Sequence, residues 1–268
     1  YNVTIIERSI YETIIPNHEN VGGGANLSSK IFGSLAFEPL NGFTLAEILI
    51  TLGIIGVVAA LTMPALIANY QKQEILSRLK KSYTVINQAL KMSENDNGEY
   101  KYWDTDLSPD EYLNNYWLPY INVNLLCTDY SVCGYKSNTP WSRYNRGGNY
   151  TRFIDSTWRR PFLTADGILY SISVKGGNEF AKNLIIVDVN GPKKPNRFGH
   201  DVYLFSRTAE GGIRPFGYDK SSDEIDTNCK RASDMDYCAA KIIKDGWQFA
   251  KDYECCLLYT SPSPRDRS

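Results

Sequence analysis

The pattern of hydrophobic and polar positions changes once within the N-terminal third of the chain. Residues 48–68 form a run of 21 residues without an ionisable side chain, and as a helix this run spans roughly 30 Å, the thickness of a bilayer's hydrocarbon core. From Ile75 to Leu90 the apolar residues instead recur every three or four positions, with cations on the remaining surface. The pattern predicts one long helix over residues 43–92, with a transmembrane segment at 48–68 and an amphipathic second half.

Three short apolar stretches follow in the second half of the chain. They are "GILYSISV" at 167–174, "NLIIVDV" at 183–189 and "DVYLF" at 201–205, separated by sequences rich in turn formers. Such stretches predict strands of an antiparallel sheet. The amphipathic helix and the sheet each need a partner for an apolar face, so we expect them to pack together in an α+β fold. This globular domain is predicted to cover residues 93–254.

The two ends of the chain differ from the rest. Residues 1–42 contain a glycine run, "VGGG", and show no sustained hydrophobic period, so we interpret them as a flexible leader or as translated upstream sequence. Residues 255–268 include "LLYTSPSPRDRS", which we interpret as an artefactual or a disordered tail.

The cysteine spacing points to an oxidising compartment. Four of the 6 cysteines form two local pairs, Cys127 with Cys133 and Cys229 with Cys238. A zinc site would need cysteines at C-x-x-C spacing or nearby histidines, and the 2 histidines lie far from both pairs in the sequence. Two disulfides are therefore the favoured interpretation, which places the globular domain outside the cytoplasm. The formal net charge of -1 and the scattered cations give no electrostatic footprint for nucleic acid.

One stretch carries a specific family resemblance. "GFTLAEILITLGIIGVVAALTMP", residues 42–64, resembles the cleavage and methylation signal of type IV prepilins and type II secretion pseudopilins. The resemblance implies a pilin-like fold, in which the long helix lies on a small antiparallel sheet. It also implies that prepilin peptidase cuts between Gly42 and Phe43 and that the new amino group of Phe43 is methylated.

The same resemblance assigns a role to Glu47. In the family, this acid pairs with the terminal amine of a neighbouring subunit during filament assembly. The physical logic agrees, because a carboxylate in a low-dielectric environment needs a cation close by, and cleavage creates one at Phe43. The alternative is that Glu47 lies in the headgroup region of the membrane, where Gln would replace it without loss of assembly.

Two observations give opposite orientations. Only Lys30 lies within about twenty residues before the helix, whereas several cations follow it, so the positive-inside rule alone would put the globular domain in the cytoplasm. The cleavage signal and the cysteine pairs favour the reverse. We therefore expect a single-pass inner-membrane protein with a cytoplasmic N-terminus and a periplasmic or extracellular domain.

A calcium site is suggested by Asp188, Asn190 and Asp201. "DVNG" resembles the start of an oxygen-ligand loop, and some pseudopilins bind calcium. The EF-hand pattern fails, however, at Pro192 and at the position that needs a glutamate. Side chains that cap a turn are the competing interpretation.

The expected function is structural, since no catalytic motif occurs and one histidine beside an aspartate does not make a base. We expect a subunit of a type II secretion pseudopilus or a type IV pilus. Its partners would be inner-membrane lipid, prepilin peptidase, copies of itself, other pilin-like subunits, and the secretion or pilus assembly machinery. The alternative is a membrane-anchored extracytoplasmic binding module, calcium-dependent or not, that does not polymerise.

Overall fold

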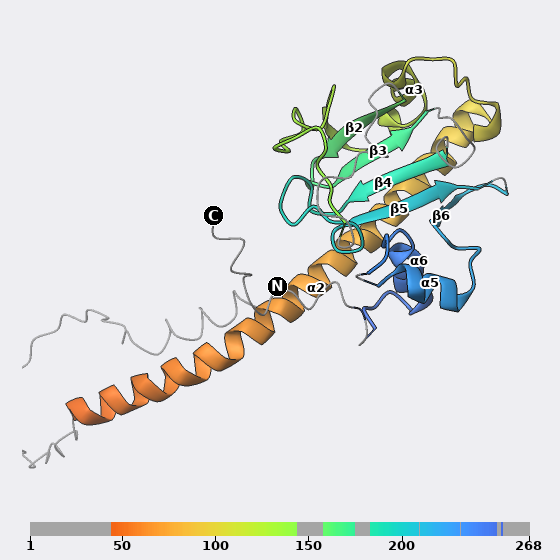
Figure 1. Ribbon diagram of the computed structural model, residues 1–268. Coiled ribbons are helices and arrows are strands. Elements are labelled where there is room, and N and C mark those ends of the chain that lie inside the picture. Colours follow the sequence, from red (N-terminus) through yellow and green to blue (C-terminus); the bar gives the residue numbers. More distant parts are fainter. Residues whose placement is uncertain are drawn as a thin grey trace, which may run out of the picture. The chain divides into compact units, whose positions relative to one another are not determined.

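The computed structural model describes residues 44–143, 158–174, 183–208, 210–230, 232–250 and 253. Contacts divide the chain into two units, Tyr1–Leu49 and Ile50–Ser268, and every strand of the described residues lies in the second. The layout is α+β, with one long helix, a six-stranded antiparallel sheet and several short helices (Figure 1). The predicted leader and tail lie outside the described residues, as does the predicted cleavage position between Gly42 and Phe43.

Helix α2 covers Leu45–Asn97 and is continuous through Pro64. It extends past the predicted end at residue 92 and stops at Gly98, whose φ of 79° lies in the left-handed region. The N–H of Gly98 donates to the carbonyl of Glu94 at 2.9 Å. A glycine in this conformation ends many helices because it has no Cβ to clash with the preceding turn. The polar stretch before Gly98 is therefore the last turn of the helix rather than a loop.

The sheet is a meander in which each strand pairs with the next one along the chain. All five pairs are antiparallel. The strands are β1 (Val123–Leu126), β2 (Arg159–Thr164), β3 (Leu169–Ser173), β4 (Leu184–Asp188), β5 (Val202–Arg207) and β6 (Ile213–Pro215). Strands β3 and β4 fall within predicted apolar stretches, and β5 begins in the third stretch and extends two residues past its end. Strands β1, β2 and β6 were not predicted.

Both faces of the sheet are covered, so every residue of β3 and β4 is buried. Because side chains alternate along a strand, Ser171 and Asp188 share one face and Phe205 lies on the other. Tyr83 of α2 stacks on Phe205 with ring centroids 5.5 Å apart. On the opposite face the hydroxyls of Tyr130 and Ser171 are 2.8 Å apart. Helix α2 thus covers one face, and the segment around Tyr130 covers the other.

Short helices complete the domain. Two of them, α3 (Pro109–Tyr116) and α5 (Ser222–Asn228), begin with a capping box in which a serine and a glutamate exchange hydrogen bonds. Helix α6 (Cys238–Lys244) packs against β5 and β6. Two single turns of 3₁₀-helix, η1 (Tyr100–Tyr102) and η2 (Leu118–Tyr120), lie on either side of α3.

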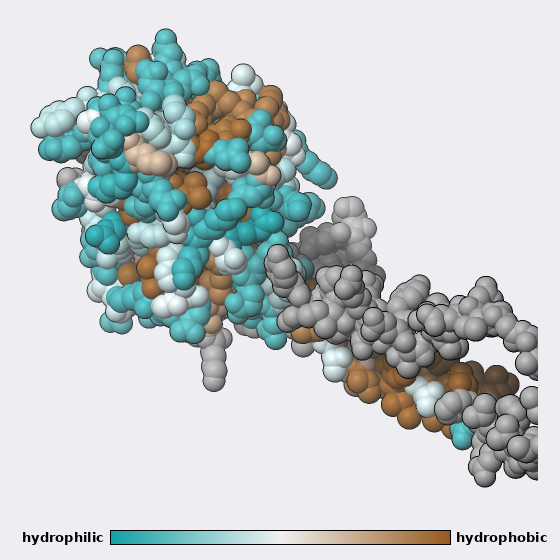
Figure 2. Space-filling view, turned by 180° about the vertical axis from the view of Figure 1, so that it is seen from behind, coloured by the Kyte–Doolittle hydropathy of each residue, from teal (hydrophilic) through white to brown (hydrophobic). Residues whose placement is uncertain are grey.

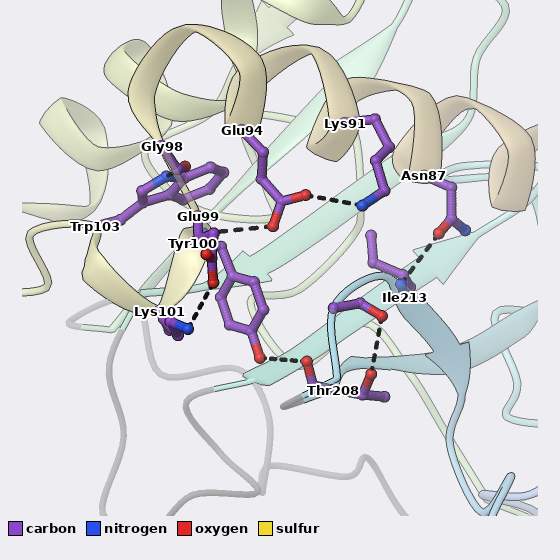
Figure 3. A network of polar contacts seen from close by, with 11 residues as sticks. Asn87, Lys91, Glu94, Gly98, Glu99, Tyr100, Lys101, Trp103, Thr208 and Ile213 are labelled. Carbon is purple, nitrogen blue, oxygen red and sulfur yellow. Dashed lines mark hydrogen bonds and ion pairs between the residues drawn. The ribbon is translucent and has the colours of Figure 1, made fainter.

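The last turns of α2 are tied to the turn between β5 and β6 (Figure 3). The N–H of Ile213 donates to the side-chain oxygen of Asn87 at 3.1 Å. The hydroxyl of Tyr100, just after the helix, donates to the carbonyl of Thr208. The indole of Trp103 folds back and donates to the carbonyl of Gly98 at 2.8 Å. The bonds of Asn87 and Tyr100 fix the C-terminal end of the helix to one edge of the sheet, and the Trp103 bond fixes the following segment to the end of the helix.

Candidate functional site

The N-terminal half of α2 exposes mostly apolar side chains, some of which are visible in brown in Figure 2. Its large apolar residues expose between 42% and 78% of their surface: Leu45, Ile48, Leu49, Ile50, Leu52, Ile54, Ile55, Val57, Val58, Leu61, Met63, Leu66 and Ile67. By length and composition, this helix is long enough and apolar enough to cross a membrane. Exposed apolar surface is unfavourable in water by about 25 cal/mol per Å². The helix therefore needs an apolar environment that the described part of this chain does not supply.

Glu47 closes the first turn of α2. Its carboxylate oxygen Oε2 accepts hydrogen bonds from the N–H of Thr44 at 2.8 Å and from the Thr44 hydroxyl at 2.9 Å. In return the N–H of Glu47 donates to the Thr44 hydroxyl at 3.2 Å. This is a capping box, which satisfies amide groups that have no partner within the helix. The acid predicted to act in assembly thus also stabilises the start of the helix.

Two glycines of the apolar half have no local explanation. A Cβ added at Gly53 or Gly56 would meet no atom of the described chain within 4 Å. Glycine in a helix interior is less favourable than alanine by about 1 kcal/mol. Among the described residues, neither position therefore needs glycine for packing.

Two of the cations that follow the apolar segment, Arg78 and Lys81, contact the globular domain at Asp166. Arg78 Nε lies 3.0 Å from Glu74 Oε1, and its Nη1 donates to the carbonyl of Asp166 at 3.1 Å. Lys81 Nζ lies 2.7 Å from the carboxylate of Asp166. Burial raises the pKa of Asp166, but hydrogen bonds from Lys81 and Thr164 outweigh this and hold it below its ordinary value. Two of the cations behind the positive-inside argument are therefore already paired with protein groups.

Both predicted disulfides are present. Cys127 is bonded to Cys133 and Cys229 to Cys238, closing loops with sequence separations of 6 and 9 residues. All four cysteines are buried. The first loop carries Tyr130 onto the sheet, and the second joins the end of α5 to the start of α6. Cys255 and Cys256 lie outside the described residues.

The predicted calcium ligands lie in and beside the connection between β4 and β5. Asp188 ends β4 and is fully buried. One of its oxygens, Oδ2, accepts hydrogen bonds from the hydroxyl of Tyr135 at 2.8 Å and from the indole of Trp141 at 3.0 Å. No motif in the chain points to these two partners, which lie 53 and 47 residues away along the chain. Asp188 thus joins the sheet to the segment that covers this face.

Asp201 has the turn-capping role that competed with the calcium interpretation. Its Oδ1 accepts from the N–H of Arg197 at 2.6 Å. Its Oδ2 accepts from the N–H of Asn196 at 2.8 Å and from the side-chain amide of Asn190 at 3.2 Å. Each of these bonds closes the connection between β4 and β5 on itself. The two interpretations are compatible, because a carboxylate oxygen has lone pairs for more than one partner.

Burial and mutual repulsion dominate the electrostatics of this pair. Burial and the nearby Asp201 raise the pKa of Asp188 well above its ordinary value, despite the hydrogen bonds from Tyr135 and Trp141. Burial also raises the pKa of Asp201, to about 6. Within the described residues, no group of three or more His, Cys, Asp or Glu side chains is arranged to hold a metal. A cation bound near Asp188 and Asp201 would therefore also need oxygen ligands from side-chain amides and backbone carbonyls.

His200, which directly precedes Asp201 in the chain, lies in the interior of the domain. It is buried, and burial together with the charge of Arg197 lowers its pKa to about 4. Its backbone carbonyl accepts a hydrogen bond from the Tyr203 hydroxyl at 2.7 Å. At neutral pH this imidazole is uncharged.

A buried arginine that the sequence did not single out joins two distant segments. The guanidinium of Arg143 lies 4.8 Å from the ring centre of Phe198 and forms ion pairs with Asp234 and Asp236. Its side chain is fully buried. Both aspartates lie within the loop closed by Cys229 and Cys238. Together, the ion pairs and the disulfide fix this loop to the globular domain.

Comparisons with known proteins give one match. The model of a family of unknown function (DUF6613) matches residues 65–144, which run from the apolar part of α2 to the end of the segment carrying Tyr135 and Trp141. Neither the curated proteins nor the solved structures contain a match to this chain.

Proposed function

We propose that this chain is a membrane-anchored, pilin-like structural subunit, of either a type II secretion pseudopilus or a type IV pilus. Prepilin peptidase would remove the leader between Gly42 and Phe43, and α2 would hold the subunit in the inner membrane until assembly. The observation that carries the proposal is the division of α2 into an exposed apolar half and a half packed on an antiparallel sheet. One helix of this kind can serve as a membrane anchor and later as the core of a filament.

The disulfides and the paired cations support the proposed orientation. Disulfides form and persist outside the cytoplasm, and the described domain holds two of them. The cations that would favour a cytoplasmic domain include Arg78 and Lys81, which are paired with Glu74 and Asp166. The proposal therefore puts the domain on the periplasmic or extracellular side.

Features of the apolar half support self-association. Gly53 and Gly56 lie three residues apart, on the same side of the helix, and leave a shallow strip where another helix can approach closely. Glu47 is positioned near the start of the same helix, where the amine of a processed neighbour would provide the cation that a desolvated carboxylate needs. Lipid alone would explain the apolar surface but not the two glycines.

A second candidate is a membrane-anchored binding module that does not polymerise. The buried acidic pair Asp188 and Asp201 favours this candidate only if ligand binding, rather than assembly, is the main role of the domain. The two candidates differ in whether copies associate through the apolar helix.

Two differently tagged copies, expressed together and extracted in mild detergent, test this difference. The proposal predicts that they co-purify and that Gly53→Leu abolishes co-purification. Val58→Leu is the matched control, because Val58 lies about 170° around the helix from the midpoint of the two glycines. Copies that never co-purify, or that tolerate Gly53→Leu and Val58→Leu equally, would favour the binding module.

A further inference from the structure

The β2–β3 turn and the β4–β5 connection meet α2 at Arg78. Its Nη1 donates to the carbonyl of Asp166 at 3.1 Å and to the carbonyl of Val189 at 3.4 Å. The turn between β5 and β6, at the other end of these strands, meets the helix further along, at Asn87. Arg78 lies about 15 Å along the helix from residue 68, the predicted end of the transmembrane segment. The β2–β3 turn and the β4–β5 connection therefore lie at the end of the domain nearest the apolar half of α2.

A third segment lies against the β4–β5 connection. A Cβ added at Gly134, which directly follows the loop closed by Cys127 and Cys133, would lie 3.4 Å from Cγ of Pro192. The connection also lies against the β2–β3 turn, because a Cβ at Gly191 would be only 2.7 Å from the carbonyl oxygen of Gly167. The β2–β3 turn, the β4–β5 connection and residues 134–136 thus form one surface, which we call the membrane-end surface.

The lysines at this end have no carboxylate partner. Lys136, Lys193 and Lys194 belong to the membrane-end surface and are exposed. Lys72 is partly exposed and lies on α2, about 6 Å past residue 68. Among the described residues, no ion pair includes any of these four lysines. Other lysines of the domain do have a carboxylate partner: Lys81, Lys91, Lys101, Lys220 and Lys241.

The acids of the same segments do not balance these lysines. Glu74 and Asp166 are paired with cations of α2. Asp188 and Asp201, at the two ends of the β4–β5 connection, are buried. Asp129, in the loop before Gly134, is partly exposed, and its carboxylate accepts hydrogen bonds from two backbone N–H groups. The described part of this end therefore presents an excess of positive charge.

We propose that the membrane-end surface binds the headgroups of anionic phospholipids and so holds the globular domain against the membrane. The headgroup layer extends roughly 6 Å beyond the hydrocarbon core on each side. The potential of anionic lipids reaches about 8 Å further at physiological salt. The level of Arg78, about 15 Å past the apolar segment, is within this range. The inference rests on the membrane anchor of the proposed function, but not on filament assembly or leader removal.

The chemistry of the surface favours this occupant over a protein partner. Lysine ammonium groups on exposed loops attract phosphate groups, and each lysine near an anionic lipid surface strengthens binding roughly fivefold. The ends of the β4–β5 connection are fixed, since the Asp201 carboxylate accepts from the N–H groups of Asn196 and Arg197. Lys193 and Lys194 are therefore held together at the end of the domain that α2 would bring closest to the lipid.

Acetylation of the full chain in lipid vesicles, measured at each lysine by mass spectrometry, tests the proposal. A membrane-impermeant reagent would label the domains outside vesicles of phosphatidylcholine alone, or of phosphatidylcholine mixed with phosphatidylglycerol. Lys193 and Lys194 should react at least about fivefold more slowly in the anionic vesicles. High salt should remove this difference, because it screens the attraction. Lys91, an exposed residue further along α2, should react equally in both.

A double variant tests whether the lysines act together. Lys193→Gln with Lys194→Gln should raise the acetylation of Lys136 in anionic vesicles to the level in phosphatidylcholine. Lys91→Gln with Lys101→Gln removes the same charge at the other end of the domain and should leave Lys136 protected.

Two results would overturn the proposal. Equal, fast acetylation of Lys193 and Lys194 in both kinds of vesicle would mean that lipid does not contact them. Equal, slow acetylation in both would mean that protein covers the surface instead. Neither result changes the expected co-purification of tagged copies, so the lipid contact and the proposed assembly can fail separately.

Discussion

Thr44 and Glu47 exchange three hydrogen bonds at the first turn of α2, two of them to the same carboxylate oxygen. This pairing gives Glu47 a role within its own chain, in addition to the proposed role between chains. The two roles can be separated by experiment. Glutamine can accept the same capping hydrogen bonds as glutamate, but it has no charge to offer to a neighbouring amine.

We predict that Glu47→Gln preserves the helix and its processing but weakens assembly. Loss of one charge pair should reduce co-purification of tagged copies by roughly tenfold, or about 1.4 kcal/mol. Far-ultraviolet circular dichroism should show unchanged helix content. Glu74→Gln, which affects an exposed pair on the same helix, is the control and should have no effect on association. Full co-purification with Glu47→Gln would mean that the acid only caps the helix.

Leader removal should depend on Gly42. A larger residue at this position, such as Gly42→Leu, should leave the chain uncut when it is co-expressed with prepilin peptidase, because the cleavage position in this signal requires a small residue. Gly33→Leu, nine residues upstream, should be cut normally. An immunoblot that resolves the two lengths is sufficient. A processed Gly42→Leu product would be incompatible with the assigned cleavage position.

The disulfide between Cys127 and Cys133 should stabilise the domain. Replacing both cysteines with alanine should lower the free energy of unfolding by about 2 kcal/mol, since the cross-link closes only a short loop in the unfolded chain. Thermal melting in detergent, with and without a reductant, measures this. The double variant keeps the Cys229–Cys238 bond. Its melting temperature should therefore be the same with and without reductant only if that bond resists reduction. A thiol assay that finds all four cysteines free in the native protein would disprove both disulfides.

The buried Arg143 should contribute more to stability than an exposed lysine. Arg143→Met removes a fully buried guanidinium from its ion pairs with Asp234 and Asp236 and should lower the free energy of unfolding by about 3 kcal/mol. Lys91→Met removes an exposed pair with Glu94 and should change it by less than about 1 kcal/mol. Melting temperatures of the two variants give the comparison. Equal effects would show that the Arg143 pairs are energetically unimportant.

The elements predicted from the sequence are those with a strong periodic signal. The uncharged run and the three-and-four spacing identified α2, and the apolar stretches identified β3, β4 and β5. Every residue of β3 and β4 is buried, so most residues of these two strands are apolar. The end of α2 was predicted too early because the polar residues before Gly98 resemble a turn, although they still form helical hydrogen bonds.

The missed strands have sequences that do not resemble strands. Strand β2 contains Arg159, Arg160 and Pro161, yet Arg159 is buried against Ser173 and Arg160 pairs with Asp110. Strands β1 and β6 are short edge strands that depend on a neighbour for their existence. The charged residues of β2 are accommodated by tertiary contacts, which local patterns do not encode.

The candidate calcium site was predictable only in part. The spacing of Asp188, Asn190 and Asp201 singled out the residues, but their burial and the contacts of Tyr135 and Trp141 with Asp188 arise from the fold. A sequence motif names the oxygen donors of a loop. It does not show which of their lone pairs are already used.

The most direct test of the central claim is the intact mass and N-terminal sequence of membrane-extracted protein after co-expression with a prepilin peptidase. The proposed function predicts a chain that begins at N-methylated Phe43. An uncut chain recovered from the membrane under the same conditions would contradict it and would indicate an ordinary single-span anchor.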